Sequence, residues 1–213
     1  MAIELTVSPD LGTVLRIGAL TCDVSRVVEH DAGLAESIGQ IERMARSGES
    51  VDVGPARQLY RSIGLDPTKT RPASEALLRR VRRGDSFPRI NTLVDICNWC
   101  SLEFQLPYGL YDLDQVEPPV TVRRGREGEA YAGIRKDEVH LNGRLTLADA
   151  RGPFGNPSSD SARTMVTTSA RRLLVVVFGP ATILTAAMSR ILDITASRCV
   201  RFAGGVETWR WVE

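Results

Sequence analysis

Three polar residues inside an otherwise apolar stretch, Asn91, Asp95 and Asn98, have the chemistry and the spacing of a candidate site. They recur at intervals of four and three residues, which places them along one side of a helix. Amide and carboxylate groups in such a row can bind a ligand. They can also form a structural network, and a buried network is tolerated only when every member is hydrogen-bonded. The spacing alone leaves both interpretations open.

A second candidate is the segment GPFGNPSSDSART at 152–164, which is rich in turn-forming residues. Its backbone N–H groups and the polar residues near its end could line a pocket for a carboxylate or a phosphate. It contains neither the P-loop nor the dinucleotide-binding fingerprint. A tight connection between two strands is the other interpretation. The candidate pocket residues in this segment are Gly152, Pro153, Phe154, Gly155, Asn156, Asp160, Arg163 and Thr164.

Arginines crowd residues 71–89, where six of them accompany two acidic residues and give a local net charge of +4. The guanidinium fork suits phosphate oxygens, so one helix carrying this cluster could contact a nucleic-acid backbone. The other interpretation is a solvated helix end whose arginines offset the helix dipole, in a chain that uses 25 Arg and only 2 Lys throughout. The candidate RNA-binding residues are Arg79, Arg80, Arg82 and Arg83.

The four cysteines, Cys22, Cys97, Cys100 and Cys199, include one C-x-x-C pair. A structural zinc site needs four ligands, and the other two cysteines and both histidines are isolated in the sequence. The pair also falls in the middle of an expected helix, whereas a redox motif starts one. We therefore expect buried packing residues, no metal, no cofactor and a reducing, cytoplasmic compartment.

The composition is that of an ordinary globular chain of 213 residues, with 43% hydrophobic and 25% charged residues and a net charge of +1. This length suits one large domain. A balanced charge gives no global attraction to DNA or to a membrane, and no apolar run is long enough to span a bilayer. No G-x-S-x-G sequence or suitably placed histidine supports nucleophilic catalysis.

Helical patterns occupy the first half of the chain and strand patterns the second, which predicts an α+β fold. Apolar spacing predicts helices at 34–46, 54–63, 72–83 and 90–104 and a last helix at 181–198. One or two strands are expected within 3–30, several short strands after Pro107, and a final strand at 205–211.

Residues 88–130 also carry a series of short motifs that resemble the B3/B4 region of the bacterial phenylalanyl-tRNA synthetase β subunit. The matching segments are Arg89-Ile90-Asn91, Val94-Asp95-Ile96-Cys97-Asn98-Trp99, Leu102-Glu103, Pro107 and Tyr111-Asp112-Leu113-Asp114. The resemblance extends over 56–180, within one domain that spans 1–213. Residues 1–55 would form an amino-terminal extension, and 181–213 a closing helix and strand.

The resemblance implies a layered β/β/α domain and a function linked to tRNA. It implies a free-standing B3/B4-like protein that binds tRNA or aminoacyl-tRNA, at most as a hydrolase that removes a wrong amino acid in trans. It further implies that Asn91, Asp95 and Asn98 form a buried structural network. Two alternatives are a non-catalytic binder of an amino acid or other small anion in the same pocket, and a partner-binding remnant without pocket chemistry.

Two departures from the family pattern bear on specificity. The family's pocket histidine corresponds to Gly109, which joins the candidate pocket residues, and the strand that carries the family's tyrosine-reading Glu has no acidic residue between Thr164 and Pro180. A site that lacks its hydrogen-bonding partner loses selectivity for a hydroxyl group. We therefore expect a cavity without the family's imidazole and carboxylate, and altered specificity.

Overall fold

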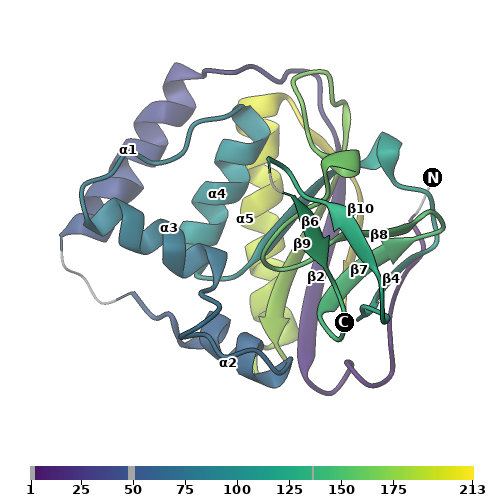
Figure 1. Cartoon of the computed structure of the whole chain (residues 1–213). Coiled ribbons are helices and arrows are strands. Elements are labelled where there is room, and N and C mark those ends of the chain that lie inside the picture. Colours follow the sequence, from purple (N-terminus) through teal and green to yellow (C-terminus); the bar gives the residue numbers. More distant parts are fainter. Residues whose placement is uncertain (1–2, 48–50, 136) are drawn as a thin grey trace.

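Two four-stranded sheets stacked face to face occupy one side of the molecule, and most of the helices cover the other side (Figure 1). The helix Gly54–Ser62 instead contributes Leu59 and Tyr60 to the core between the sheets. The computed structural model describes residues 3–47, 51–135 and 137–213. The first sheet has the order β1 (Leu5–Val7), β4 (Val120–Arg124), β7 (Leu145–Asp149) and β8 (Gly152–Gly155). The second has the order β10 (Val206–Val212), β2 (Leu15–Asp23), β9 (Arg172–Pro180) and β3 (Tyr108–Asp112). A small hairpin, β5 (Ala130–Ala132) and β6 (Glu138–His140), lies apart from both.

Five helices complete the described chain: α1 (Ala32–Arg46), α2 (Gly54–Ser62), α3 (Ala73–Arg82), α4 (Thr92–Phe104) and α5 (Thr185–Ala203). The last of these starts and ends later than the predicted 181–198. Residues 181–184 form a turn after β9, and the helix continues until Gly204 takes the left-handed conformation, with φ of 58°. A glycine in that conformation is a common way for a helix to end.

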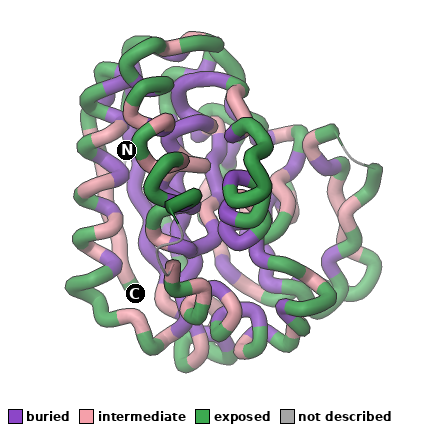
Figure 2. Tube along the Cα trace, turned by 90° about the vertical axis from the view of Figure 1, so that its left-hand side faces the viewer, coloured by how far each residue is buried: buried purple, intermediate pink, exposed green. Residues whose placement is uncertain are grey.

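Strand β9 explains the three layers, because both of its faces are buried. Leu173, Val175 and Val177 belong to the core between the second sheet and the helices. Their neighbours Leu174, Val176 and Phe178 belong to the core between the two sheets. Alternate residues of a strand point to opposite faces, so a continuous apolar run is what a middle layer requires. The β/β/α arrangement follows, and the buried segments run through the centre of the fold (Figure 2).

Strand β3 lies at the edge of the second sheet, paired only with β9. Successive side chains of β3 point to opposite faces of the sheet, so they enter the two cores in turn. Leu110 packs with the helices, whereas Tyr111 packs between the sheets with Phe154. A segment that lies against this edge can therefore contact residues of both cores. Among the described residues, none of the helices is long and apolar enough to cross a bilayer.

Candidate functional site

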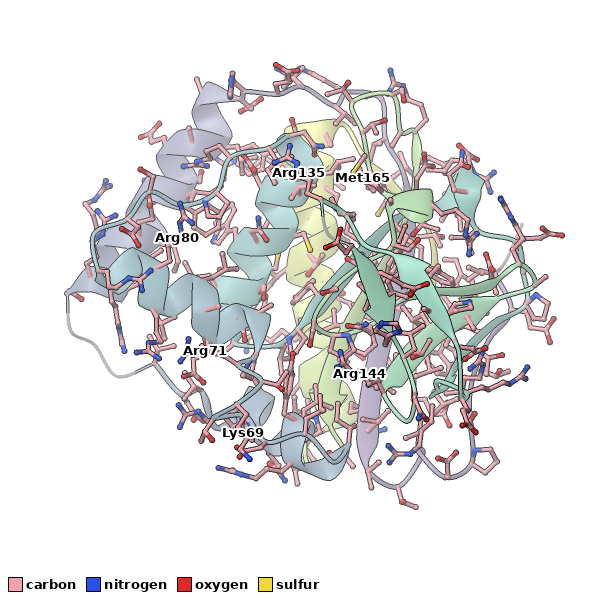
Figure 3. The ribbon with its side chains drawn as sticks, viewed as in Figure 1. Lys69, Arg71, Arg80, Arg135, Arg144 and Met165 are labelled. Carbon is pink, nitrogen blue, oxygen red and sulfur yellow. The ribbon has the colours of Figure 1, made fainter. Side chains whose placement is uncertain are left out.

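A pocket of about 210 Å³ opens between α4, β3 and the segment that follows β8. Most of its wall is apolar and comes from Ile90, Val94, Leu110, Ile134, Met165 and Val166. The remaining lining residues carry polar or ionisable groups: Cys97, Asn98, Tyr108, Arg135 and Asp160. Ile90 and Met165 are 45% and 39% exposed, which places them where the pocket opens to solvent. Arg135 and Met165 lie close to each other in Figure 3.

The segment that carries Asp160 is held in place by several hydrogen bonds. The Asn156 side-chain carbonyl accepts from the backbone N–H groups of Ser158 and Ser159, at 2.8 and 2.9 Å. The Tyr60 hydroxyl lies 2.9 Å from the Ser158 hydroxyl, and the Tyr131 hydroxyl donates to the Ser159 carbonyl at 2.5 Å. Because these tyrosines come from α2 and β5, the segment is fixed from two directions.

A third tyrosine holds Asp160 itself. The Tyr111 hydroxyl donates to the Asp160 carboxylate at 2.8 Å. Gly109 and Gly155 flank that hydroxyl, and a Cβ on either glycine would overlap it. Neither glycine is among the residues that line the pocket. Of the three predicted pocket glycines, these two therefore act indirectly, since they leave the space through which Tyr111 reaches the carboxylate.

Asp160 is a partly buried acid without a cationic partner. Within the described ranges no Arg, Lys or His forms an ion pair with it. Burial raises the pKa of Asp160 to about 7, opposed by the hydrogen bonds from Tyr111 and the Leu110 backbone N–H. The carboxyl group therefore changes its charge near neutral pH, where an ordinary surface aspartate is fully ionised.

A basic groove of about 480 Å³ lies beside the pocket. Its cationic lining residues are Arg71, Arg80 and Arg83, and Asn98 and Ser158 complete its polar surface. Arg71 and Arg80 are labelled in Figure 3, to the left of Arg135. Asn98 lines both the groove and the pocket. The two depressions thus meet at one side chain, with arginines on one side of it and a carboxyl group on the other.

The three residues of the polar stripe do not share one role. The Asn91 side chain caps α4 by accepting from the N–H groups of Leu93 and Val94, and Asp95 accepts from the Ile90 N–H at 2.9 Å. The Asn98 side chain, in contrast, has no hydrogen bond to any residue that the structure describes. The expected structural network therefore includes Asn91 and Asp95 but not Asn98. Asn98 lies about two turns after Asn91 on the same side of α4, away from the free N–H groups of the helix start, and it lines the pocket instead.

The predicted arginine cluster is divided in a similar way. Arg80 and Arg83 line the groove, whereas Arg79 and Arg82 do not. Arg82 donates to the Ala45 carbonyl on α1 at 3.2 Å, on another side of α3. Arg71, which precedes the helix, completes the groove instead. Two further exposed cations, Lys69 and Arg144, are labelled in the same view of Figure 3.

Most of the predicted loop residues support the fold rather than line the pocket. Arg163 donates two hydrogen bonds, at 2.9 and 3.0 Å, to the fully buried side chain of Asp149. Its guanidinium group also lies over the Phe154 ring. Thr164 is buried and contacts the Phe154 carbonyl. Gly152, Pro153, Phe154 and Gly155 form β8. From the predicted set, only Asp160 lines the pocket directly.

The C-x-x-C pair has one member in the pocket and one in the core. Cys97 lines the pocket, and burial raises the pKa of its thiol well above the ordinary value. Cys100 is buried and accepts from Arg198 of α5 at 3.1 Å. Within the described ranges no group of three or more His, Cys, Asp or Glu side chains is placed to hold a metal ion.

The expectation of a cavity without a carboxylate needs a correction. Strand β9 contributes no acidic group, as predicted from its sequence, but Asp160 supplies one from the segment after β8. Sequence reasoning included Asp160 among the candidates without foreseeing that it alone would enter the pocket. It did not identify Tyr111 or Arg135. The one local signal for Tyr111 was the alternation of glycine and tyrosine at 109 and 111 on a strand.

The comparisons with known proteins agree with the resemblance in the sequence. The model of the B3/4 domain matches residues 55–212. The phenylalanine–tRNA ligase beta subunit of Xanthomonas campestris pv. campestris (strain 8004) is 34% identical over 214 residues, covering 97% of this chain and 26% of that protein. The beta subunit of Carboxydothermus hydrogenoformans is 27% identical over 156 residues, covering 71% and 19%. The chain therefore spans about a quarter of the length of these relatives or less.

A solved structure shows the same fold. It is the crystal structure of an N-terminal fragment of the phenylalanyl-tRNA synthetase beta subunit from Pyrococcus horikoshii. The TM-score is 0.52 at 15% sequence identity, and the match covers all of this chain and 54% of the fragment.

Proposed function

The chain belongs to the B3/4 domain family, and on this premise we propose that it binds the 3′ end of aminoacylated tRNA and hydrolyses a wrongly attached amino acid. The phosphates lie in the basic groove and the aminoacyl group lies in the pocket. The observation that carries the proposal is the position of Asn98, which lines both. A phosphate chain and the group esterified to its end need two adjoining sites of this kind.

The charges around the groove support a polyanionic ligand. Arg71, Arg80 and Arg83 line it. Lys69, two residues before Arg71, is exposed and forms no ion pair with any residue that the structure describes. Part of the arginine charge is already balanced, because Arg83 pairs with Asp85 at 2.9 Å. A flexible single strand can still use these guanidinium groups, since exposed ion pairs contribute little energy.

The pocket supports a less polar aminoacyl group. Its walls are mainly aliphatic, and its volume of about 210 Å³ matches an amino-acid side chain rather than a nucleotide. Strand β9 carries no acidic residue where the family reads tyrosine. We therefore expect a specificity other than tyrosine. Charged tRNA is used in the cytoplasm, and we expect the protein there.

Binding of charged and uncharged tRNA at several salt concentrations tests this function. Affinity for tRNA should fall with salt, with a slope that shrinks by about 0.7 for each phosphate that the protein no longer neutralises. Arg80→Ala should reduce both the affinity and the slope. Arg79→Ala is the matched control, because it removes an exposed arginine from the same helix but outside the groove. Equal effects of the two substitutions, or binding that does not respond to salt, would contradict the proposal.

A second candidate function is binding of a free amino acid, and Asp160 favours it over binding of an anion. A carboxylate in an apolar pocket repels a phosphate but can accept hydrogen bonds from an α-ammonium group. Arg163, the expected anion ligand, is already engaged by Asp149. A thermal-shift screen with free amino acids tests this candidate, since a ligand at 100 times its Kd stabilises the fold by about 2.7 kcal/mol.

A further inference from the structure

We propose that Asp160 is the general base of this pocket and holds the water that attacks the aminoacyl ester, an assignment that rests on the proposed function. A carboxylate has about four lone-pair positions. Tyr111 and the Leu110 N–H use two of them, so two remain for a water molecule in the pocket. No described cation forms an ion pair with the carboxylate, so its free lone pairs can accept a proton from that water.

The position of the carboxylate is fixed well enough for this role. Asp160 ends a short segment whose two preceding residues are each held by a tyrosine. Its own carboxylate is held by Tyr111. A base that is already oriented loses little freedom when the substrate binds, which is the main contribution that positioning makes to a rate. The side chains of Asn98 and Arg135 line the same pocket and are the donors available to the ester carbonyl oxygen.

The reaction needs only water as a second reactant. Asp160 takes one proton from the water as the water oxygen bonds to the carbonyl carbon of the ester, and the Asn98 amide and Arg135 guanidinium face the negative charge on the carbonyl oxygen. The bond from that carbon to the ribose oxygen then breaks. The leaving ribose oxygen receives the proton from Asp160, which restores the carboxylate. The products are a free amino acid and tRNA with a free terminal hydroxyl.

The groups that face Asp160 do not change charge near neutral pH. Tyr111 from β3, Tyr131 from β5 and Cys97 from α4 all have a pKa raised above its ordinary value by burial, so they stay neutral. Arg135, in the turn after β5, stays positive. Asp160 must be ionised to act, so the hydrolysis rate should rise with pH and level off above about pH 7, which is the pKa of its carboxyl group.

The experiment measures deacylation of tRNA charged in turn with each standard amino acid, using the full chain. Asp160→Asn should lower the rate on the best substrate at least about a hundredfold, the usual contribution of a general base. It should still bind a stable analogue in which the amino acid is joined by an amide bond. Asp23→Asn, an exposed aspartate at the end of β2, is the matched control and should leave the rate unchanged.

Tyr111→Phe provides a second measurement that does not depend on the first variant folding. It removes a hydrogen bond that favours the ionised form, so the pH of half-maximal rate should move upward while the rate at high pH recovers. An unchanged rate for Asp160→Asn or an unchanged pH profile for Tyr111→Phe would overturn the assignment and leave the proposed function intact. No hydrolysis by a wild-type protein that binds the analogue would overturn both the assignment and the hydrolytic part of the proposed function, and leave only the binding of charged tRNA. Failure of the wild-type protein to bind the analogue would reject both.

Discussion

Tyr111 and Asp160 are 49 positions apart in the chain, and the phenolic hydroxyl of one donates a 2.8 Å hydrogen bond to the carboxylate of the other. Tyr111 belongs to the core between the sheets, whereas Asp160 lines the pocket on the helical side of β3. The bond therefore crosses the edge of the second sheet. Because this hydrogen bond favours the ionised form of Asp160, the position of Tyr111 between the sheets affects the charge in the pocket.

The space around the Tyr111 hydroxyl should be sensitive to a single methyl group. Gly109→Ala and Gly155→Ala would each place a Cβ on that hydroxyl, and overpacking of this kind typically costs about 1–3 kcal/mol. Chemical denaturation measures the free energy of unfolding. Gly39→Ala in α1 meets only the flexible end of Arg43 and should stabilise the fold by about 0.5–1 kcal/mol. A neutral effect at both 109 and 155 would show that the tyrosine can move aside freely.

Asp160 should make the stability of the fold depend on pH between about 4 and 7. Its pKa in the fold, about 7, is above that of the unfolded chain, so the fold keeps its proton after the unfolded chain has lost one. This contribution is complete below the unfolded pKa and is lost as pH rises to 7, with a slope of at most about 1.4 kcal/mol per pH unit. The measurement is the difference in the free energy of unfolding between wild type and Asp160→Asn across this range. Other acids, such as Glu75 whose pKa is lowered by Arg57, contribute equally to both proteins, so their pH dependence does not appear in the difference. A pH-independent difference would mean that Asp160 has an ordinary pKa.

Two asparagines of the same helix should have opposite phenotypes. Asn91→Ala removes the cap of α4 and should cost about 0.5–2 kcal/mol of stability. Asn98→Ala removes a side chain without described hydrogen bonds and should leave stability within about 0.5 kcal/mol. It should nevertheless weaken binding of charged tRNA. Denaturation and binding measured on both variants test this, and a large loss of stability in Asn98→Ala would return that residue to the structural network.

The ion pair between Arg163 and Asp149 should matter for stability alone. The Asp149 side chain is fully buried, and Arg163 is 22% exposed. Removal of one partner of a buried pair leaves an uncompensated charge, and Arg163→Met should cost about 3–5 kcal/mol. At a temperature where the variant stays folded, its affinity for tRNA should equal that of wild type. A selective loss of binding would place Arg163 in the site after all.

Secondary structure and family could be predicted from the sequence because both depend on patterns of residues that are close together in the chain. Apolar spacing predicted the first four helices with their ends within one residue of Arg46, Ser62, Arg82 and Phe104 and their starts within two residues. The motifs between 88 and 130 indicated the family that the whole-chain comparison confirms. The α+β class followed from the order of the patterns. The last helix was displaced by several residues, because its start depends on how the chain leaves β9 and not on its own apolar spacing.

The composition of the pocket was decided by the tertiary structure. The sequence by itself determined that Asp160 and Arg163 are polar residues of a turn-rich segment and that Asn91 and Asn98 lie on one side of a helix. The residue types and their spacing left a binding role and a structural role open for each of them. Which of them enters the pocket depends on the stacking of the two sheets and on the rotation of α4. Arg163 forms an ion pair with Asp149, and Asn91 accepts hydrogen bonds from the start of its own helix. Of these four residues, only Asp160 and Asn98 line the pocket. A polar group is available to a ligand only when the fold has not already satisfied it, and its partners come from segments that are distant in the chain.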